Sequence, residues 1–430
     1  MNKPYLGLVP PKPKTMGLFK RTKNTNKPVL RQILDLIPDW ILQRNINKFN
    51  ADKGCHKYKT YDQLVALTFG QLCKCTTLAD ISAGLAVSQT FISDLKLKQN
   101  PAKSTMSDGN KNRTWRVFEA LYFDLLRHYK HVLKHKHRSD VIDEVKRHAI
   151  KIIDSTTIPL CLSLFDWAKF RTAKGGIKIH TCWDDTLQIP DVINITEAAV
   201  HDSKGFVQQV FKKDTIIVED RGYFEFNLML ARIKAENIFV TRIKSNTVYE
   251  VIEEIDLPDF KDQHILKDEL IILTGTKALK TGIEKIILRR VAVYDEKNNK
   301  VIEIITNQLS WDAATIGALY KKRWDIELFF KALKQNLQVK TFIGTSENAV
   351  RSQIYVALIN YLLLELLRRN TCKTKQGLSN FSEKIRICLT YYLSIEYVCN
   401  QIKPTVSRLI TKPPNTTQQH IFCINQTSLL

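Results

Sequence analysis

The sequence AIKIIDSTTI at residues 149–158 is the first of several β-branched segments that decide the fold class. GIKIHTCWDD at 176–185, IPDVINITEAAV at 189–200 and DTIIVEDRGY at 214–223 have the same strand-like composition. Between the last of these and NIFVTRIK at 237–244 lies EFNLMLARIKA, whose apolar residues have helical spacing. Strands that alternate with a helix predict an α/β fold.

The rest of the chain divides around this α/β segment. Short alternating runs separated by turn residues predict a β-rich stretch without helices, and both flanks show helical periodicity. We therefore expect a flexible basic arm (1–28), an all-α region (29–147), the first part of an α/β core (148–246), a β-rich insertion (247–308), a second part of the core with C-terminal helices (309–398) and a polar tail (399–430).

The composition indicates a globular protein with a polyanionic partner. The 430 residues include 65 Lys and Arg against 43 Asp and Glu, a formal net charge of +22. Such an excess is typical of nucleic-acid binding, and the alternative is a solvated basic surface without a specific ligand. Nine scattered cysteines without zinc-site spacing predict a reduced, cytoplasmic protein. The most apolar window, 354–367, carries Asn360 and Glu365 and predicts a buried core helix.

Two short helices are expected around a tight turn at Val87-Ser88. Thr77-Leu-Ala-Asp80 resembles a capping box that would begin the first helix, and QTFISDLKL would form the second. Lysines 96, 98 and 103 follow. This arrangement predicts a helix-turn-helix-like unit that contacts DNA, and an ordinary packed helical hairpin is the alternative.

Three carboxylates stand out by position. Asp154 and Asp220 end two predicted strands, and Glu327 lies on a predicted helix far downstream. Strand-end side chains converge at one edge of an α/β sheet, where ligand sites usually lie. Carboxylate oxygens suit Mg²⁺ or Mn²⁺, and two such ions about 4 Å apart can promote cleavage of a phosphodiester. A structural role as cap or turn residues is the alternative for each Asp.

One helix face is expected to combine metal-binding and phosphate-binding chemistry. Tyr320, Arg323, Glu327 and Lys334 are separated by three, four and seven residues. On a single α-helix these positions fall within an arc of roughly 60°. The face would therefore present a carboxylate beside a phenol, a guanidinium and an ammonium group. A solvated face with an i,i+4 pair of Arg323 and Glu327 is the alternative.

The sequence YKKRWDIELFFKALK at 320–334 resembles the Y-(2)-R-(3)-E-(6)-K signature of bacterial insertion-sequence transposases of the DDE type, and it matches all four positions. The preceding ITNQLSWDAATIGALY resembles the lead-in to that signature. IIDSTTI and IIVEDRGYF resemble the first two catalytic blocks of the family, and KGGIKIHTCWD and TEAAVHD resemble segments between them. The resemblance covers about residues 60–370.

The resemblance implies an RNase H-like catalytic core interrupted by a β-rich insertion. It implies metal-dependent cleavage at transposon ends, followed by transfer of the exposed 3′-hydroxyl to target DNA. By position, Asp154, Asp220 and Glu327 would bind two Mg²⁺ or Mn²⁺ ions, and Tyr320, Arg323 and Lys334 would contact DNA phosphates. A DNA-bound homodimer, double-stranded terminal inverted repeats and target DNA as partners, and a location at the bacterial nucleoid are also implied.

Some functional questions stay open at the level of sequence. Family members can hold a flipped base on an aromatic residue near the insertion, and Tyr249, Tyr294 and Trp311 are the candidates here. Two other functions share the same residues or the same charge. One is an RNase H-like nuclease without strand transfer, and the other is a DNA-binding regulator with an inactive core. Terminal inverted repeats flanking the gene would favour the transposase.

Overall fold

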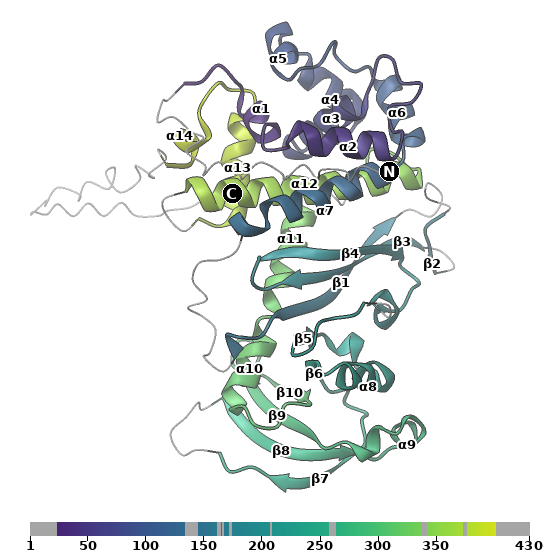
Figure 1. The fold of residues 1–430 in the computed structure, drawn as a ribbon, viewed down its shortest axis with the longest axis vertical. Coiled ribbons are helices and arrows are strands. Elements are labelled where there is room, and N and C mark those ends of the chain that lie inside the picture. The colour runs from purple at the N-terminus through teal and green to yellow at the C-terminus, as the bar shows by residue number, and fades with distance from the viewer. Residues whose placement is uncertain are drawn as a thin grey trace, which may run out of the picture.

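A computed structural model shows a mixed α/β protein with a large mixed sheet and a helical layer at its N-terminal side (Figure 1). The structure describes residues 24–133, 145–160, 165, 167–171, 174–206, 209–257, 264–337, 342–372 and 376–400. The expected basic arm lies almost entirely outside these residues, and so does nearly all of the expected polar tail.

The all-α region forms as expected between Val29 and Leu133. Its helices are α1 (Val29–Leu34), α2 (Asp39–Lys48), α3 (Thr60–Leu72), α4 (Leu78–Leu85), α5 (Gln89–Asp94), α6 (Lys103–Asn112) and α7 (Arg116–Leu133). The capping box that begins α4 is present, because the Thr77 hydroxyl accepts from the Asp80 amide at 3.1 Å and the Asp80 carboxylate accepts from the Thr77 amide at 2.9 Å.

The predicted strands assemble into one ten-stranded sheet. Its order is β2-β3-β1-β5-β6-β10-β9-β8-β7, with β4 paired to β3. The strands are β1 (Ile150–Leu160), β2 (Lys169–Arg171), β3 (Lys174–Asp184), β4 (Ile189–Glu197), β5 (Ile216–Glu219), β6 (Ile238–Arg242), β7 (Tyr249–Glu254), β8 (Ile265–Leu273), β9 (Leu288–Asp295) and β10 (Lys300–Thr306). Strands β1, β5 and β6 are parallel, and helix α8 (Phe226–Lys234) connects β5 to β6. This is the predicted alternation.

The β-rich stretch differs from its prediction in two ways. It contains helix α9 (Thr276–Thr281) and a short 3₁₀ turn at Ile283–Lys285, so the expectation of a stretch without helices was wrong. Gly282, at a φ of +82°, ends α9 and begins that turn, a backbone conformation that glycine adopts without a steric penalty. The stretch also continues the main sheet, because β10 pairs with β6.

The C-terminal helices return to cover the sheet and to hold the N-terminal helices. They are α10 (Ala313–Lys321), α11 (Trp324–Asn336), α12 (Glu347–Thr371), α13 (Leu378–Cys388) and α14 (Ile395–Asn400). Helix α12 lies along α7 between the other N-terminal helices and the sheet (Figure 1). It is long and apolar enough to cross a membrane, but 94% of its apolar window is buried in the protein, which matches the predicted core helix.

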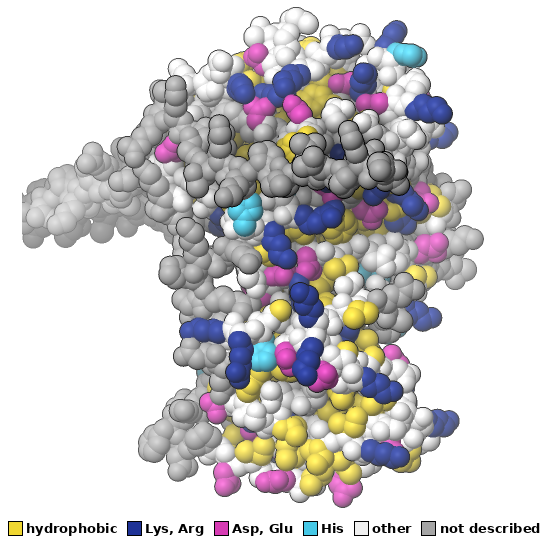
Figure 2. Space-filling view, viewed as in Figure 1, with side chains coloured by type: hydrophobic (Ala, Val, Ile, Leu, Met, Phe, Trp, Pro, Cys, Tyr) yellow, Lys and Arg dark blue, Asp and Glu magenta, His cyan; other side chains and the backbone are white. Residues whose placement is uncertain are grey.

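Charged side chains of both signs are interspersed over the face shown in Figure 2. The hydrophobic side chains gather more densely towards the β7 end, where Val251 and Ile252 on the edge strand are exposed. Every cysteine that the structure describes is a free thiol.

Candidate active site

Strands β1 and β5 place two of the predicted carboxylates side by side. The parallel register pairs Ile153 with Glu219, so Asp154 and Asp220 are the next residues at the same edge. The pairing of β1 with β5 ends there, while β1 continues against β3. The expectation that Asp154 ends its strand was wrong, because β1 runs on to Leu160 and only its pairing with β5 stops here. Residues at the same level of two neighbouring parallel strands lie side by side, and this still places Asp154 next to Asp220.

The third carboxylate, Glu327, lies on α11, and the segment expected to form one continuous helix is two helices. The predicted helical face is divided, because α10 ends at Lys321 and α11 begins at Trp324. The amide of Arg323 donates to the Tyr320 carbonyl at 3.1 Å, and the Asp325 amide donates to the Lys322 carbonyl at 3.0 Å. These i→i−3 hydrogen bonds tighten the backbone at the junction. Tyr320 therefore belongs to α10, whereas Glu327 and Lys334 belong to α11.

Arg323 joins the carboxylates at this junction. Its guanidinium lies 2.5 Å from Glu327 Oε1 and 3.4 Å from Asp154 Oδ2. The pKa of Asp154 is raised to about 7, first by burial and then by the nearby carboxylates of Asp220 and Glu327, against the opposing effects of the Ser155 amide and Arg323. One cation thus faces three acidic side chains from three distant segments of the chain.

Tyr320 completes the same group from the end of α10. Its ring centroid lies 5.9 Å from the guanidinium carbon of Arg323, and the side chain is 8% exposed. Burial raises the pKa of Tyr320, and the positive charge of Arg323 opposes that rise. Lys334 lies seven residues beyond Glu327 on α11, which is about 10 Å along a helix axis. The structure thus brings together five of the six predicted residues and places the sixth two turns away.

A network behind Asp154 was not predicted from the sequence. The amide of Ser155 donates to Asp154 Oδ1 at 2.7 Å, and its hydroxyl donates to Asp202 Oδ1 at 2.6 Å. The ammonium of Lys178 lies 3.0 Å from the same Asp202 oxygen. The resemblance of TEAAVHD to a family segment was the available signal for Asp202. The family-like segments IIDSTTI and KGGIKIHTCWD, which contain Ser155 and Lys178, were the corresponding signals for those two residues.

Asp325 lies outside this group although it is close in sequence. Burial raises its pKa, and the Lys322 ammonium opposes that rise. Lys322 also lies 3.0 Å from Asp185 Oδ1. Asp325 and Asp185 therefore share the Lys322 cation at the start of α11. Residues two positions apart on a helix point about 160° away from each other, so Asp325 faces away from Glu327.

The three aromatic candidates for base holding have ordinary packing partners. Trp311 is 8% exposed, and its ring lies against His148 with centroids 5.4 Å apart. Tyr249 on β7 faces the Arg290 guanidinium at 5.2 Å. The hydroxyl of Tyr294 donates to Asn299 at 2.6 Å. These contacts single out none of the three as a base-holding residue.

The donor chemistry of the site suits a hard divalent cation, but the carboxylates are not arranged as a ligand set. Among the described residues, no group of three or more His, Cys, Asp or Glu side chains has metal-binding spacing. Arg323 lies between Asp154 and Glu327 and supplies the nearest positive charge. Burial raises the pKa of Asp154, and a cation bound beside this carboxyl would stabilise its charged form.

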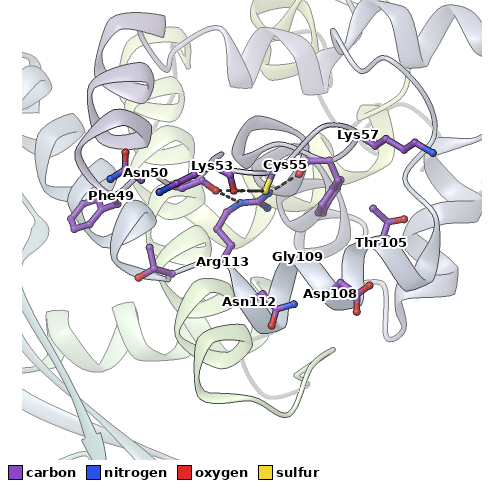
Figure 3. A pocket seen from close by; sticks show the side chains of 13 residues that line it. Phe49, Asn50, Lys53, Cys55, Lys57, Thr105, Asp108, Gly109, Asn112 and Arg113 are labelled. Carbon is purple, nitrogen blue, oxygen red and sulfur yellow. Dashed lines mark hydrogen bonds between the residues drawn. The ribbon is translucent and has the colours of Figure 1, made fainter.

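A cavity of about 490 Å³ lies elsewhere, among the N-terminal helices between the α2–α3 connection and α6 (Figure 3). Its wall includes Arg113, which donates to the carbonyls of Ala51 at 3.1 Å and Tyr58 at 2.6 Å and to Gln63 Oε1 at 2.6 Å. Arg113 therefore fastens the 49–58 segment to α3 and does not offer a free guanidinium to a ligand. None of the three site carboxylates lines this cavity.

Comparison with known proteins places the site within a recognised domain. The profile of the family described as "Transposase DDE domain" matches residues 146–363, and "Domain of unknown function (DUF4372)" matches residues 25–91. The first match contains Asp154, Asp220 and Glu327 together with Arg323.

Two curated relatives carry related names. A putative transposase of Sinorhizobium fredii is 33% identical over 225 residues, which cover 52% of this chain and 62% of that protein. A probable transposase for an insertion sequence element of Geobacillus stearothermophilus is 27% identical over 248 residues, or 58% of this chain and 64% of that protein. The chain thus matches less than two thirds of the length of either relative.

One solved structure, a synaptic complex of piggyBac transposase with hairpin DNA, aligns with 92% of this chain and with 88% of its own chain. The two chains are 13% identical, and the TM-score is 0.40. A likeness at that level is too low to assign a fold or a function. The assignment comes from the domain profile, which covers half of the chain and includes the carboxylate cluster. The chain belongs to the family of proteins that carry a transposase DDE domain.

Proposed function

We propose that this protein is a DNA transposase that binds the terminal inverted repeats of an insertion sequence, cleaves DNA at those ends and transfers them to target DNA. The observation that carries the proposal is the convergence of Asp154, Asp220 and Glu327 around Arg323. These residues come from two strands and a distant helix, and all lie within the matched transposase domain.

The proposed core is RNase H-like and spans 148–246 and 309–398, with an insertion at 247–308. Support comes from the parallel order β1-β5-β6 with β3 antiparallel to β1. Helix α11, which carries Glu327, packs on β1. The insertion would add β10, β9, β8 and β7 to the far end of the same sheet, beyond β6. The segment 29–147 would be the DNA-binding domain.

Membership of the DDE family implies dependence on a divalent cation in general terms. Asp154, Asp220 and Glu327 are the side chains that would hold it, and two Mg²⁺ or Mn²⁺ ions are the proposed cofactors. When bound, such ions would activate the attacking oxygen and stabilise the leaving oxygen of the phosphodiester.

The basic residues of the site would position the DNA backbone. Arg323 has a rigid planar set of donors that suits phosphate oxygens, and two carboxylates orient it. Tyr320 supports the guanidinium from the end of α10. Lys334 would contact a second phosphate two turns further along α11. Together these groups would hold the scissile phosphate next to the carboxylates.

The proposed partners are double-stranded DNA ends, target DNA and a second copy of the chain. Two ends must be held together for transposition, so a DNA-bound homodimer is proposed. A net charge of +22 supports polyanion binding and predicts a steep dependence of affinity on salt. The proposed location is the bacterial cytoplasm at the nucleoid.

A cleavage and strand-transfer assay with Mg²⁺ and DNA from the flanks of the gene tests this function. Asp154→Asn, Asp220→Asn and Glu327→Gln should each abolish both reactions and keep DNA binding. Asp325→Asn is the matched control, because it removes a carboxylate from the same helix outside the cluster. Cleavage without strand transfer by the wild type would favour the nuclease, and DNA binding without either reaction would favour the inactive regulator.

A further inference from the structure

The N-terminal helices include a rigid pair whose outer surface has no assigned role. Helix α4 and the start of α5 lie within the part of the chain that matches a domain of unknown function, which ends at residue 91, and α5 lies at the end of the molecule opposite β7 (Figure 1). The Ala86–Ser88 turn joins them, and the Ser88 hydroxyl accepts from the Phe91 amide at 3.0 Å to begin α5.

Close packing against α3 holds the pair in one orientation. A methyl group built on Gly84 would lie 2.6 Å from a ring carbon of Phe69, and one built on Gly70 would lie 2.5 Å from the terminal carbon of Ile81. Helices α3 and α4 therefore approach each other closely at two glycines, one on each helix. The ring of Phe69 also meets Phe91 on α5 at a centroid distance of 6.4 Å, so one α3 side chain contacts both helices.

Further contacts hold the inner side of α5. Phe91, Ile92 and Leu95 are buried. The hydroxyl of Tyr61 donates to the Leu95 carbonyl at 2.9 Å, and the hydroxyl of Tyr392 donates to Asp94 at 2.6 Å. The acidic side chain of α5 is therefore engaged within the protein, and the outer side of the helix carries no negative charge.

The outer side of α5 carries uncharged hydrogen-bonding groups. Gln89, Thr90 and Ser93 are exposed, and their side chains make no hydrogen bond within the described part of the chain. Val87, which is 70% exposed, is the adjoining apolar group. Lys96 and Lys98 follow at the end of the helix and are exposed. We call Gln89, Thr90 and Ser93 the recognition surface.

We propose that the recognition surface contacts base edges in the major groove of double-stranded DNA and selects its sequence, while the neighbouring lysines contact the backbone. The proposal rests on the proposed function, of which it specifies the end-recognition step. Amide and hydroxyl side chains pair with base edges, and Gln suits adenine in particular. A rigid helix pair with a polar outer face and flanking cations is the geometry that such contacts need.

The charge and the size of the surface favour DNA over a protein partner. A stable protein interface usually has a core of large apolar or aromatic side chains. Here Val87 is the only large exposed apolar side chain between Leu78 and Lys98, all of which the structure describes. Lys96 and Lys98 are exposed, and the acidic side chain of α5, Asp94, is bonded to Tyr392, so the lysines suit a phosphate backbone instead.

In vitro selection from a randomised double-stranded DNA library, with the full chain, tests the proposal. The wild type should enrich one motif. Gln89→Ala should lose discrimination at one position of that motif by roughly tenfold, and Ser93→Ala should do so at another. Lys98→Ala should keep the motif, bind all sequences more weakly and reduce the salt dependence by about one ion. Gln43→Ala, an exposed glutamine on α2, is the control and should behave as wild type.

The opposite results are equally distinct. Failure of the wild type to enrich a motif, or an unchanged motif after combined replacement of Gln89, Thr90 and Ser93, would overturn the recognition surface. Asp154→Asn should select the same motif as wild type. If the wild type selects a motif but does not cleave DNA, the proposed function is contradicted and the recognition surface is not. If the protein cleaves DNA but its selected motif does not change when Gln89, Thr90 and Ser93 are replaced, the recognition surface is contradicted and the proposed function is not.

Discussion

Two clusters of buried charge differ in how completely they are balanced. Between β8, β9 and β10, Asp268, Glu269 and Glu303 meet Arg289 and Arg290, and Lys267 lies 3.2 Å from Glu269. Three acidic groups there face three basic ones. At the candidate active site, Arg323 is the cation that pairs with Asp154 and Glu327 among the described residues, and Asp220 adds a third carboxylate beside them.

The balanced cluster is also more tightly bonded and more deeply buried than the candidate active site. Arg289 holds Asp268 through two hydrogen bonds, at 2.7 and 2.5 Å, and both side chains are at most 5% exposed. The side chain of Glu327 is 32% exposed, and Arg323 reaches Asp154 only at 3.4 Å. A balanced, closed cluster stabilises the fold, whereas an unbalanced, open cluster can accept a further positive charge.

The largest stability effect is expected in the balanced cluster. Arg289→Met should lower the free energy of unfolding by about 3–5 kcal/mol, because it leaves Asp268 buried without its partner. Urea unfolding measures the change. Lys213→Met, which breaks the exposed pair with Glu236, is the control and should leave stability unchanged. Equal losses in both variants would remove the distinction between buried and exposed pairs.

The next largest effect is expected from metal binding at the candidate active site. Without DNA, Mn²⁺ at a hundredfold excess over its Kd should stabilise the wild type by about 3 kcal/mol, measured as a rise in Tm. Asp154→Asn and Asp220→Asn should lose most of that rise, while Asp325→Asn should keep it. A rise that survives in Asp220→Asn would place the bound cation elsewhere.

A smaller effect concerns stability without added metal. Asp154→Asn should raise the free energy of unfolding by about 1 kcal/mol, because it removes a carboxylate that is disfavoured first by burial and then by the neighbouring Asp220 and Glu327. Asp268→Asn should lower the free energy of unfolding, because it leaves the buried Arg289 without its carboxylate partner. Urea unfolding of both variants at neutral pH makes the comparison. A loss of stability in Asp154→Asn as large as that in Asp268→Asn would show that the first cluster is also structural.

The smallest effect is expected at Lys334. Lys334→Ala should weaken binding to all DNA sequences and reduce the slope of log affinity against log salt by about one, as expected for one lost phosphate contact. Lys297→Ala, in the exposed turn between β9 and β10, is the control. Identical slopes in the two variants would count against a phosphate contact at Lys334.

Much of the fold followed from local patterns in the sequence. The β-branched runs around Asp154 and Asp220 became paired strands because burial on both sides demands such composition. The Thr77–Asp80 capping box began a helix where expected, because it satisfies amides that a helix start leaves free. The convergence of the two aspartates followed from the general geometry of parallel strands.

Other features depended on contacts that no local pattern records. The break at Lys322–Arg323 is one example, since the segment has helical periodicity throughout and Lys322 meets Asp185 from a distant part of the chain. Helix α9 was missed because it is a single short piece inside a strand-rich stretch. The contact of Ser155 with Asp202 and Lys178 depends on side-chain positions that spacing alone does not define.

Cleavage of end DNA by Asp220→Asn tests the central claim most directly. The variant and the wild type should bind DNA from the flanks of the gene with equal affinity, and only the wild type should cut it in Mg²⁺. Asp325→Asn should cut as the wild type does. Cleavage by Asp220→Asn at a rate close to that of the wild type would contradict the assignment of the Asp154–Asp220–Glu327 cluster as the active site.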